Sequence, residues 1–241
     1  MMMTMHKKKV GIIGGMGSRA GVKLLQLIID YSPAVTDQDF PEILYHNNSG
    51  IPDRTRAIIN GGPSPLEGIY RSLEMFNSQQ VELVAIACIT SHYYYDRIAD
   101  YSRSKVLNPL QLIADRLLHE YTAVKRVGVL ATTGSINSGL YHQALEKCNV
   151  EVVTLDPVSQ EEIFMRAVYM KNGFKSARIS DEARELLLLS VNRMKALNVD
   201  MIIGGCTEVS LGVVPESKDV IYLDALDLLA RKTVECCYNL D

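Results

Sequence analysis

Two apolar runs that lie far apart in the chain follow the same pattern. Residues 81–88 and 199–206 are short, mostly apolar stretches, and each ends at a cysteine, Cys88 in the first and Cys206 in the second. Short continuous runs of this kind are typical of strands buried on both faces of a parallel sheet. In open α/β sheets, ligands are contacted by residues just past the carboxyl ends of strands. The pattern therefore predicts two strands that each bring one cysteine to a ligand-binding edge.

The remaining apolar segments alternate between strand and helix patterns. In the first half we expect a strand from Val10 and a helix through residues 22–29, a strand at 43–45, a helix at 66–80, and a strand, turn and helix start at 105–114. In the second half we expect strands at 126–131 and 150–155, a helix at 161–170 and a helix capped by Ser180 or Asp181. Such alternation is typical of the α/β class with mainly parallel sheets.

The glycines after the first strand do not complete a dinucleotide-binding fingerprint. Gly14, Gly15 and Gly17 depart from G-x-G-x-x-G, although a shifted register ending at Ala20 comes close. We favour a tight turn at which the backbone can approach a neighbour, which glycine permits whatever the ligand.

The two halves of the chain repeat each other. Gly11 precedes Cys88 by 77 residues, and Gly128 precedes Cys206 by 78. Residues 108–114 resemble 224–230 in the same way, and three landmarks at one spacing indicate a duplication. We predict two similar α/β domains related by a pseudo-twofold axis, with the active site in the cleft between them. The first spans 1–107 and is completed by the helix at 224–241, and the second spans 108–223.

Composition and charge narrow the classes of partner. The chain has 241 residues, of which 47% are hydrophobic and 22% charged, with a net charge of −3. This balance gives no basic surface for nucleic acid or for a membrane, and no apolar run approaches the roughly 18 residues of a membrane span. The five cysteines lack scaffold spacing, so we expect reduced thiols in the cytoplasm. A small-molecule ligand or a protein partner fits best.

Cysteines at equivalent positions of duplicated domains suit one reaction class. Across an interdomain cleft they would face a common ligand, and a nearby helix N-terminus would lower each thiol pKa. Inverting a carbon that bears hydrogen requires a base on one face and an acid on the other, and a thiolate and a thiol can exchange these roles. Pairing of Cys88 with His92 is an alternative for nucleophilic catalysis, but it leaves Cys206 unexplained. Arg54, after a strand end and a proline turn, is a candidate carboxylate ligand.

These residues resemble the cofactor-independent aspartate/glutamate racemase family from about Val10 to Leu229. The matching segments are the glycine loop at 14–17, the loop containing Asn47 and Arg54, and the sequence Gly-Cys-Thr-Glu at 205–208. The resemblance implies an amino-acid racemase without a cofactor or a metal, an amino-acid substrate, and a homodimer. It implies Cys88 and Cys206 as the acid/base pair, with Arg54 and Lys171 holding a distal carboxylate. The implied substrate-binding set also contains Met16, Asn47, Ile89, Thr90, Thr133, Thr207 and Glu208.

The chain departs from the family pattern at specific positions. Ile89 replaces the asparagine that helps to hold the polar head of the substrate, Ser91 replaces an alanine, and Ser18 replaces a proline. Isoleucine cannot donate the hydrogen bond, and an unmet partner costs about 1–3 kcal/mol. Two alternatives therefore stay open: a racemase or isomerase of this fold with another amino-acid or dicarboxylic-acid substrate, and a non-catalytic amino-acid-binding homologue.

Overall fold

The computed structural model describes residues 7–212 and 220–240, which form two parallel sheets of four strands each. The first sheet has the order β2-β1-β3-β4 and the second has the equivalent order β6-β5-β7-β8. The strands are β1 Val10–Gly14, β2 Ile43–Asn47, β3 Leu83–Ile86, β4 Lys105–Val106, β5 Arg126–Leu130, β6 Glu151–Val153, β7 Met201–Gly204 and β8 Ile221–Asp224. The predicted α/β class with two similar halves is confirmed.

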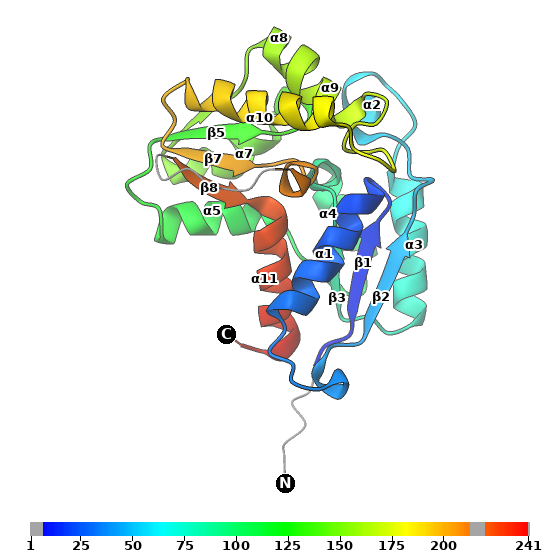
Figure 1. Cartoon of the computed structure of the whole chain (residues 1–241). Helices are drawn as coiled ribbons and strands as arrows, with labels where there is room; N and C mark the ends of the chain where they lie inside the picture. Colours follow the sequence, from blue (N-terminus) through cyan, green and yellow to red (C-terminus); the bar gives the residue numbers. More distant parts are fainter. Residues whose placement is uncertain (1–6, 213–219, 241) are drawn as a thin grey trace.

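Helices cover both sheets, and the carboxyl ends of the strands point toward the junction of the two halves (Figure 1). The α-helices are α1 Ser18–Tyr31, α2 Arg54–Ile59, α3 Leu66–Ser78, α4 Tyr95–Tyr101, α5 Pro109–His119, α6 Thr133–Asn137, α7 Leu140–Leu145, α8 Pro157–Ser159, α9 Arg166–Tyr169, α10 Asp181–Lys195 and α11 Ala225–Tyr238. The 3-10 helices are η1 Asp37–Asp39, η2 Ile89–Tyr94, η3 Glu146–Cys148 and η5 Val209–Leu211, and η4 Gln160–Met165 is a π-helix.

The repeated glycines Gly11 and Gly128 make room for a large side chain in the same way in both halves. A Cβ on Gly11 of β1 would lie 2.6 Å from Phe76 of α3, and a Cβ on Gly128 of β5 would lie 2.6 Å from Met194 of α10. In each half, the missing side chain lets one large residue of a covering helix sit directly on a central strand. Close packing of this kind tolerates little added volume.

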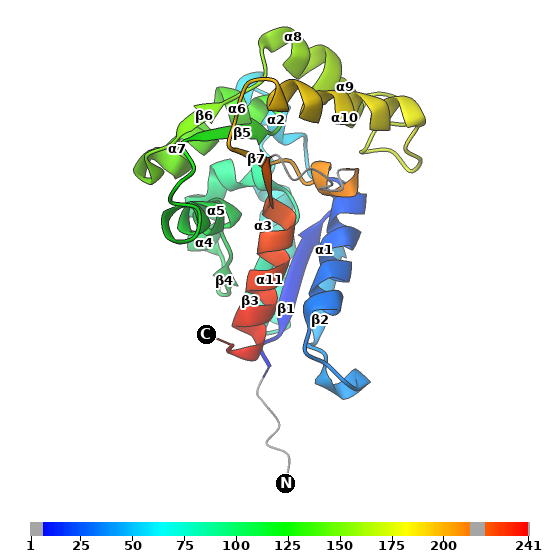
Figure 2. The same ribbon diagram turned by 60° about the vertical axis from the view of Figure 1, so that its left-hand side comes forward.

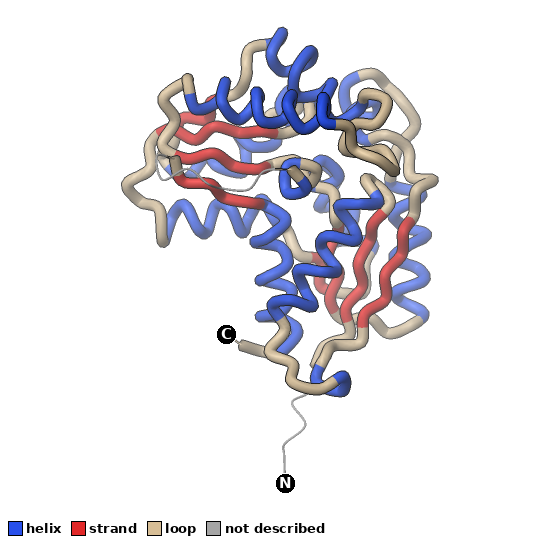
Figure 3. Tube along the Cα trace, viewed as in Figure 1, coloured by secondary structure: helices blue, strands red, loops and turns tan. Residues whose placement is uncertain are grey.

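The last helix of each half packs on the sheet of the other half. Helix α5 follows β4 of the first sheet, yet Leu110, Ile113 and Leu117 belong to the core of the second. Helix α11 follows β8 of the second sheet, yet Leu226, Leu229 and Val234 pack with β1 and β3. Figures 2 and 3 show α11 running beside α1 and the first sheet, with the described ends of the chain close together. The equivalent side-chain caps Asn108 and Asp224 begin these two helices.

Some local predictions differ from the structure. Strand β2 continues to Asn47, where we predicted a loop, because Asn47 pairs with Gly14 of β1. The segment after Cys88 forms the 3-10 helix η2 before α4 begins, and the helix predicted at 161–170 is a π-helix followed by α9. That helix ends at Tyr169, one residue before the predicted end at 170. The cap of α10 is Ser180, whose hydroxyl accepts from Ala183 N.

Candidate active site

One cavity lies where the two halves meet, and both repeat cysteines line it. It encloses about 250 Å³, including its opening, and its interior has room for about one water molecule. An amino acid is larger than this, so the cleft must open to admit one. The lining residues are Met16, Arg54, Thr55, Cys88, Ile89, Thr90, Thr132, Tyr169, Lys175, Cys206, Thr207 and Glu208.

Cys88 lies beside a buried arginine. It follows β3 and is the N-cap residue of η2. Arg54 begins α2, where it donates from Nη1 to Pro52 O at 3.0 Å and from Nη2 to Met16 O at 2.6 Å. Burial opposes the charge on Arg54, but attraction to Cys88, Asp53 and Tyr169 leaves its pKa raised. The guanidinium is therefore a permanent cation held next to the Cys88 sulfur.

Cys206 has a different environment. Its Sγ donates to Glu208 Oε2 at 2.9 Å. Burial, and then the negative charge of Glu208, raise the pKa of the Cys206 thiol well above its usual value. The predicted lowering by a helix N-terminus is wrong for this cysteine, since a turn follows β7 before the single 3-10 turn η5. The Cys206 side chain is held as a protonated thiol.

A buried ion pair completes this side of the cavity. Lys175 Nζ donates to Glu208 Oε1 at 2.9 Å and to Met16 O at 2.9 Å in the other half. Burial raises the pKa of Glu208, but the charge of Lys175 and the hydrogen bonds from Cys206 and Lys175 together outweigh burial, and the pKa is lowered. A Cβ on Gly17 would lie 2.5 Å from Glu208 Oε1, so the predicted glycine loop makes room for this carboxylate.

Three hydroxyl groups join the two halves beneath the cavity. Thr90 Oγ1 lies 2.9 Å from Thr132 Oγ1, and Ser135 Oγ donates to Thr90 Oγ1 at 3.1 Å. All three residues are buried, so these hydrogen bonds fix the register of the η2 segment against α6.

Three of the predicted substrate-binding residues lie outside the cavity lining. Asn47 is exposed, and its Oδ1 accepts from Tyr45 OH at 3.2 Å. Thr133 Oγ1 donates to the carboxylate of Glu161 in η4. Lys171 is exposed, and the lysine of the cavity is Lys175, because the chain turns back only after Gly173. The other predicted residues line the cavity, together with Thr55, Thr132, Tyr169 and Lys175, which sequence reasoning missed.

His92 does not face the Cys88 sulfur. Its Nδ1 lies 3.0 Å from the carbonyl oxygen of Cys88, so Nδ1 carries the proton and donates. Burial lowers the pKa of His92 to about 4, and the ring is neutral at pH 7. The Cys–His alternative for nucleophilic catalysis is therefore not formed.

The described residues contain neither a metal-binding cluster nor a membrane-spanning helix. No group of three or more His, Cys, Asp or Glu residues in this part of the chain could hold a metal ion. No helix within the same ranges is long and apolar enough to cross a membrane.

Comparison with known proteins places this arrangement in a family. The aspartate racemase of Picrophilus torridus is 28% identical, with a TM-score of 0.82 over 97% of this chain and 98% of that one. The Francisella tularensis glutamate racemase, solved with D-glutamate, is 18% identical with a TM-score of 0.65 over 98% and 81% of the two chains. The broad specificity amino-acid racemase RacX of Bacillus subtilis (strain 168) is 22% identical over 93% of this chain and 96% of its own. The Asp/Glu/Hydantoin racemase family model matches residues 13–233, and the chain belongs to this family.

Proposed function

We propose that this protein is a cofactor-independent racemase that inverts the α-carbon of aspartate or glutamate with Cys88 and Cys206 as its acid/base pair. The observation that carries the proposal is that both buried cysteines line one cavity together with the cations Arg54 and Lys175. A buried thiol pair with two cations suits a substrate that has an exchangeable α-hydrogen and carboxylate groups.

The two sulfurs have different environments, and we assign them different roles. Cys88 lies beside the Arg54 guanidinium, whereas Cys206 is held as a thiol against the Glu208 carboxylate. For one enantiomer, Cys88 acts as the base and takes the α-proton from one face, while Cys206 S–H delivers a proton to the opposite face of the carbanion. The protonation states of the two sulfurs are then exchanged. The opposite enantiomer reacts in the reverse sense and restores the starting state.

Arg54 and Lys175 are the cations that we assign to carboxylate binding. Arg54 Nε has no hydrogen-bond partner in the described structure although it is buried, so it has capacity for a ligand oxygen. Lys175 replaces the predicted Lys171 in this role because it alone of the two lines the cavity. Both charges also stabilise the carbanion that forms between the two sulfurs.

Ile89 favours a second candidate, a racemase of less polar amino acids. Its side chain lines the cavity and packs into the core of the second half with Ile113 and Tyr141. It therefore gives an apolar wall where the family pattern has an amide. The similarity to a broad specificity racemase is consistent with this candidate.

The test is a panel of single enantiomers of acidic and neutral amino acids incubated with the protein in D₂O without added cofactor. Chiral chromatography measures inversion, and NMR measures exchange of the α-hydrogen. We expect inversion with deuterium incorporation for aspartate or glutamate. Inversion of neutral amino acids alone would replace the first candidate by the second. Binding without exchange would identify a non-catalytic homologue.

A further inference from the structure

Two residues of the second half are the most exposed of the described residues that line the cavity. Ten of the twelve lining residues are buried, whereas Lys175 is half-buried and Tyr169 is 42% exposed. Among the described residues, these two therefore mark the side of the cavity that lies nearest to solvent. Lys175 Nζ lies 5.3 Å from the centre of the Tyr169 ring, so the two side chains pack against each other at the opening.

These two residues are held by bonds of different strength. Lys175 is fixed by the buried Glu208 carboxylate and by Met16 O, and breaking such a pair leaves an uncompensated buried charge. Tyr169 OH donates to Asp53 Oδ2 at 2.9 Å, on the loop before α2 in the first half. This hydrogen bond is exposed, so water can replace it at little net cost. Figure 1 shows α9, which ends at Tyr169, next to α2.

We infer that Tyr169 is the gate of the cavity, and that its hydrogen bond to Asp53 across the two halves holds the gate closed. Breaking this bond frees the ring to move away from the opening while the Lys175–Glu208 pair stays in place. The same Asp53 carboxylate caps α2 by accepting from Arg56 N at 2.9 Å through its other oxygen. Closing the gate thus ties Tyr169 to the element that begins with Arg54.

The gate is a property of the cavity and can be tested without any assumption about the reaction. The probe is iodoacetamide, with the alkylation rates of individual cysteines in the full-length protein measured by peptide mass spectrometry. In Tyr169→Phe the ring remains and only the hydroxyl is lost. We expect Cys88 and Cys206 to react roughly three to ten times faster, the shift in an opening equilibrium that one hydrogen bond supports. Tyr169→Ala should increase both rates further.

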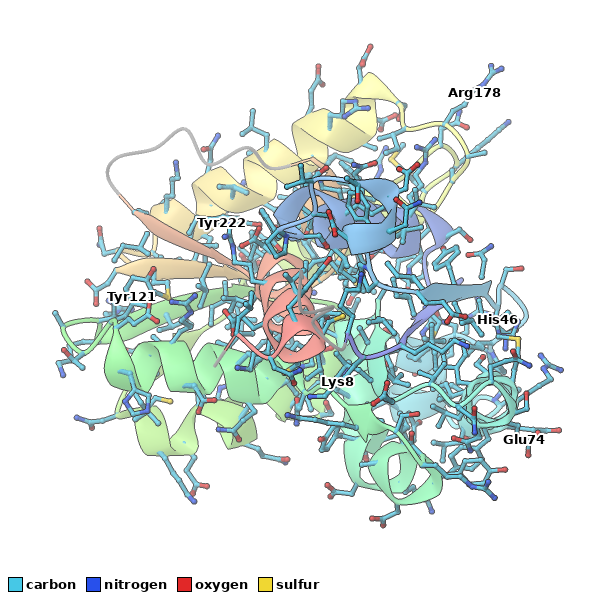
Figure 4. All side chains as sticks on the ribbon, turned by 90° about the horizontal axis from the view of Figure 1, so that it is seen from below. Lys8, His46, Glu74, Tyr121, Arg178 and Tyr222 are labelled. Carbon is cyan, nitrogen blue, oxygen red and sulfur yellow. The ribbon has the colours of Figure 1, made fainter. Side chains whose placement is uncertain are left out.

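Two controls separate gating from loss of structure. Cys237 is fully buried in the core of the first half, and its alkylation reports global unfolding. Tyr101→Phe removes a similar exposed hydrogen bond, from Tyr101 OH to Glu74, outside the cavity lining. Figure 4 shows Glu74 at the edge of the molecule, well apart from Arg178 of the loop that follows the gate. Tyr101→Phe should leave all three rates unchanged.

The gate would be overturned if the alkylation rates of Cys88 and Cys206 were the same in both Tyr169 variants as in the wild type. It would also be overturned if the alkylation rate of Cys237 rose in parallel with the other two. The effect on turnover rests on the proposed function. If opening of the gate limits release of the product, Tyr169→Phe should raise kcat and KM together. The dependence of kcat on solvent viscosity should then become weaker. Faster alkylation in a protein that exchanges no α-hydrogen would support the gate and reject the racemase.

Discussion

At the scale of single residues, Glu208 gives Cys206 a negatively charged neighbour, whereas Cys88 lies beside the positively charged Arg54. Its carboxylate accepts from Cys206 Sγ and, after burial, is the main cause of the raised pKa of that thiol. Glu208→Gln removes this negative charge and also releases the positive charge of Lys175 from its partner. Both changes favour the Cys206 thiolate.

We therefore predict that Glu208→Gln lowers the pKa of Cys206. The alkylation rate of Cys206 measured against pH should rise at lower pH than in the wild type, while the profile of Cys237 stays in place. Glu74→Gln, a change at a surface carboxylate, is the matched control. An unchanged or raised midpoint for Cys206 would show that Glu208 does not control this thiol.

His92 is a second residue whose pKa shift predicts how stability changes with pH. Its pKa is about 4 in the folded protein, against 6.5 for an ordinary histidine, because the ring is buried. Between these values the unfolded chain binds a proton that the folded chain does not bind. Stability should therefore decrease as pH falls from 6.5 to about 4, by about 3 kcal/mol in total.

Urea unfolding over this pH range measures the effect. His92→Asn keeps a donor toward the Cys88 carbonyl but cannot titrate, so its stability should depend less steeply on pH than that of the wild type. Equal slopes for the two proteins would mean that His92 is protonated in the fold.

At the scale of elements, α6 and α2 meet through a glycine. A Cβ on Gly134 of α6 would lie 2.8 Å from Thr55 Cα, one residue after Arg54, and Figure 2 shows the two helices side by side. In an ordinary helix, Gly→Ala stabilises by up to about 1 kcal/mol. Here the added methyl group would push against the Cα atom and the side chain of Thr55 in the other half.

Gly134→Ala should therefore lower the free energy of unfolding by about 1–3 kcal/mol and displace Arg54 from the cavity. Gly50→Ala is the control, since its nearest neighbour would be 3.8 Å away, and it should change stability by less than about 0.5 kcal/mol. Urea titration of both variants measures this difference. A Gly134→Ala protein as stable as the wild type would mean that the interface adjusts easily.

The elements also differ in how well they could be predicted from the sequence. Seven of the eight described strands and the repeat were predicted from apolar runs, equivalent glycines and the resemblance of residues 108–114 to 224–230, whereas β8 was not predicted. Tyr169, at the end of α9, and Lys175, after the turn that follows α9, were not predictable, because the path of this segment depends on contacts with the other half. Tyr169 bonds to Asp53, and Arg19 donates to Ser176 O at 2.9 Å.

At the scale of the whole molecule, the exchange of α5 and α11 makes each sheet depend on the other half of the chain. Without α11, Leu24, Ile28 and the outer face of β1 would lose their apolar cover. We predict that the two halves unfold in one cooperative transition.

Pulsed alkylation during urea unfolding tests this prediction at one thiol in each half, Cys237 in the first core and Cys206 at the end of β7. Their exposure should follow a single midpoint that coincides with the loss of helical circular dichroism. Two separate midpoints would show that the halves are independent domains.

The most direct test of the two-thiol mechanism is deuterium incorporation into each separate enantiomer of the preferred substrate by Cys88→Ser and Cys206→Ser in D₂O. In a two-base racemase each enantiomer loses its α-proton to a different sulfur. Both variants should therefore lose racemisation, while each retains slow exchange of one enantiomer only, with opposite preferences. Full racemisation by both variants, or the same residual preference in the two, would contradict the mechanism and leave the paired cysteines as a consequence of fold symmetry alone.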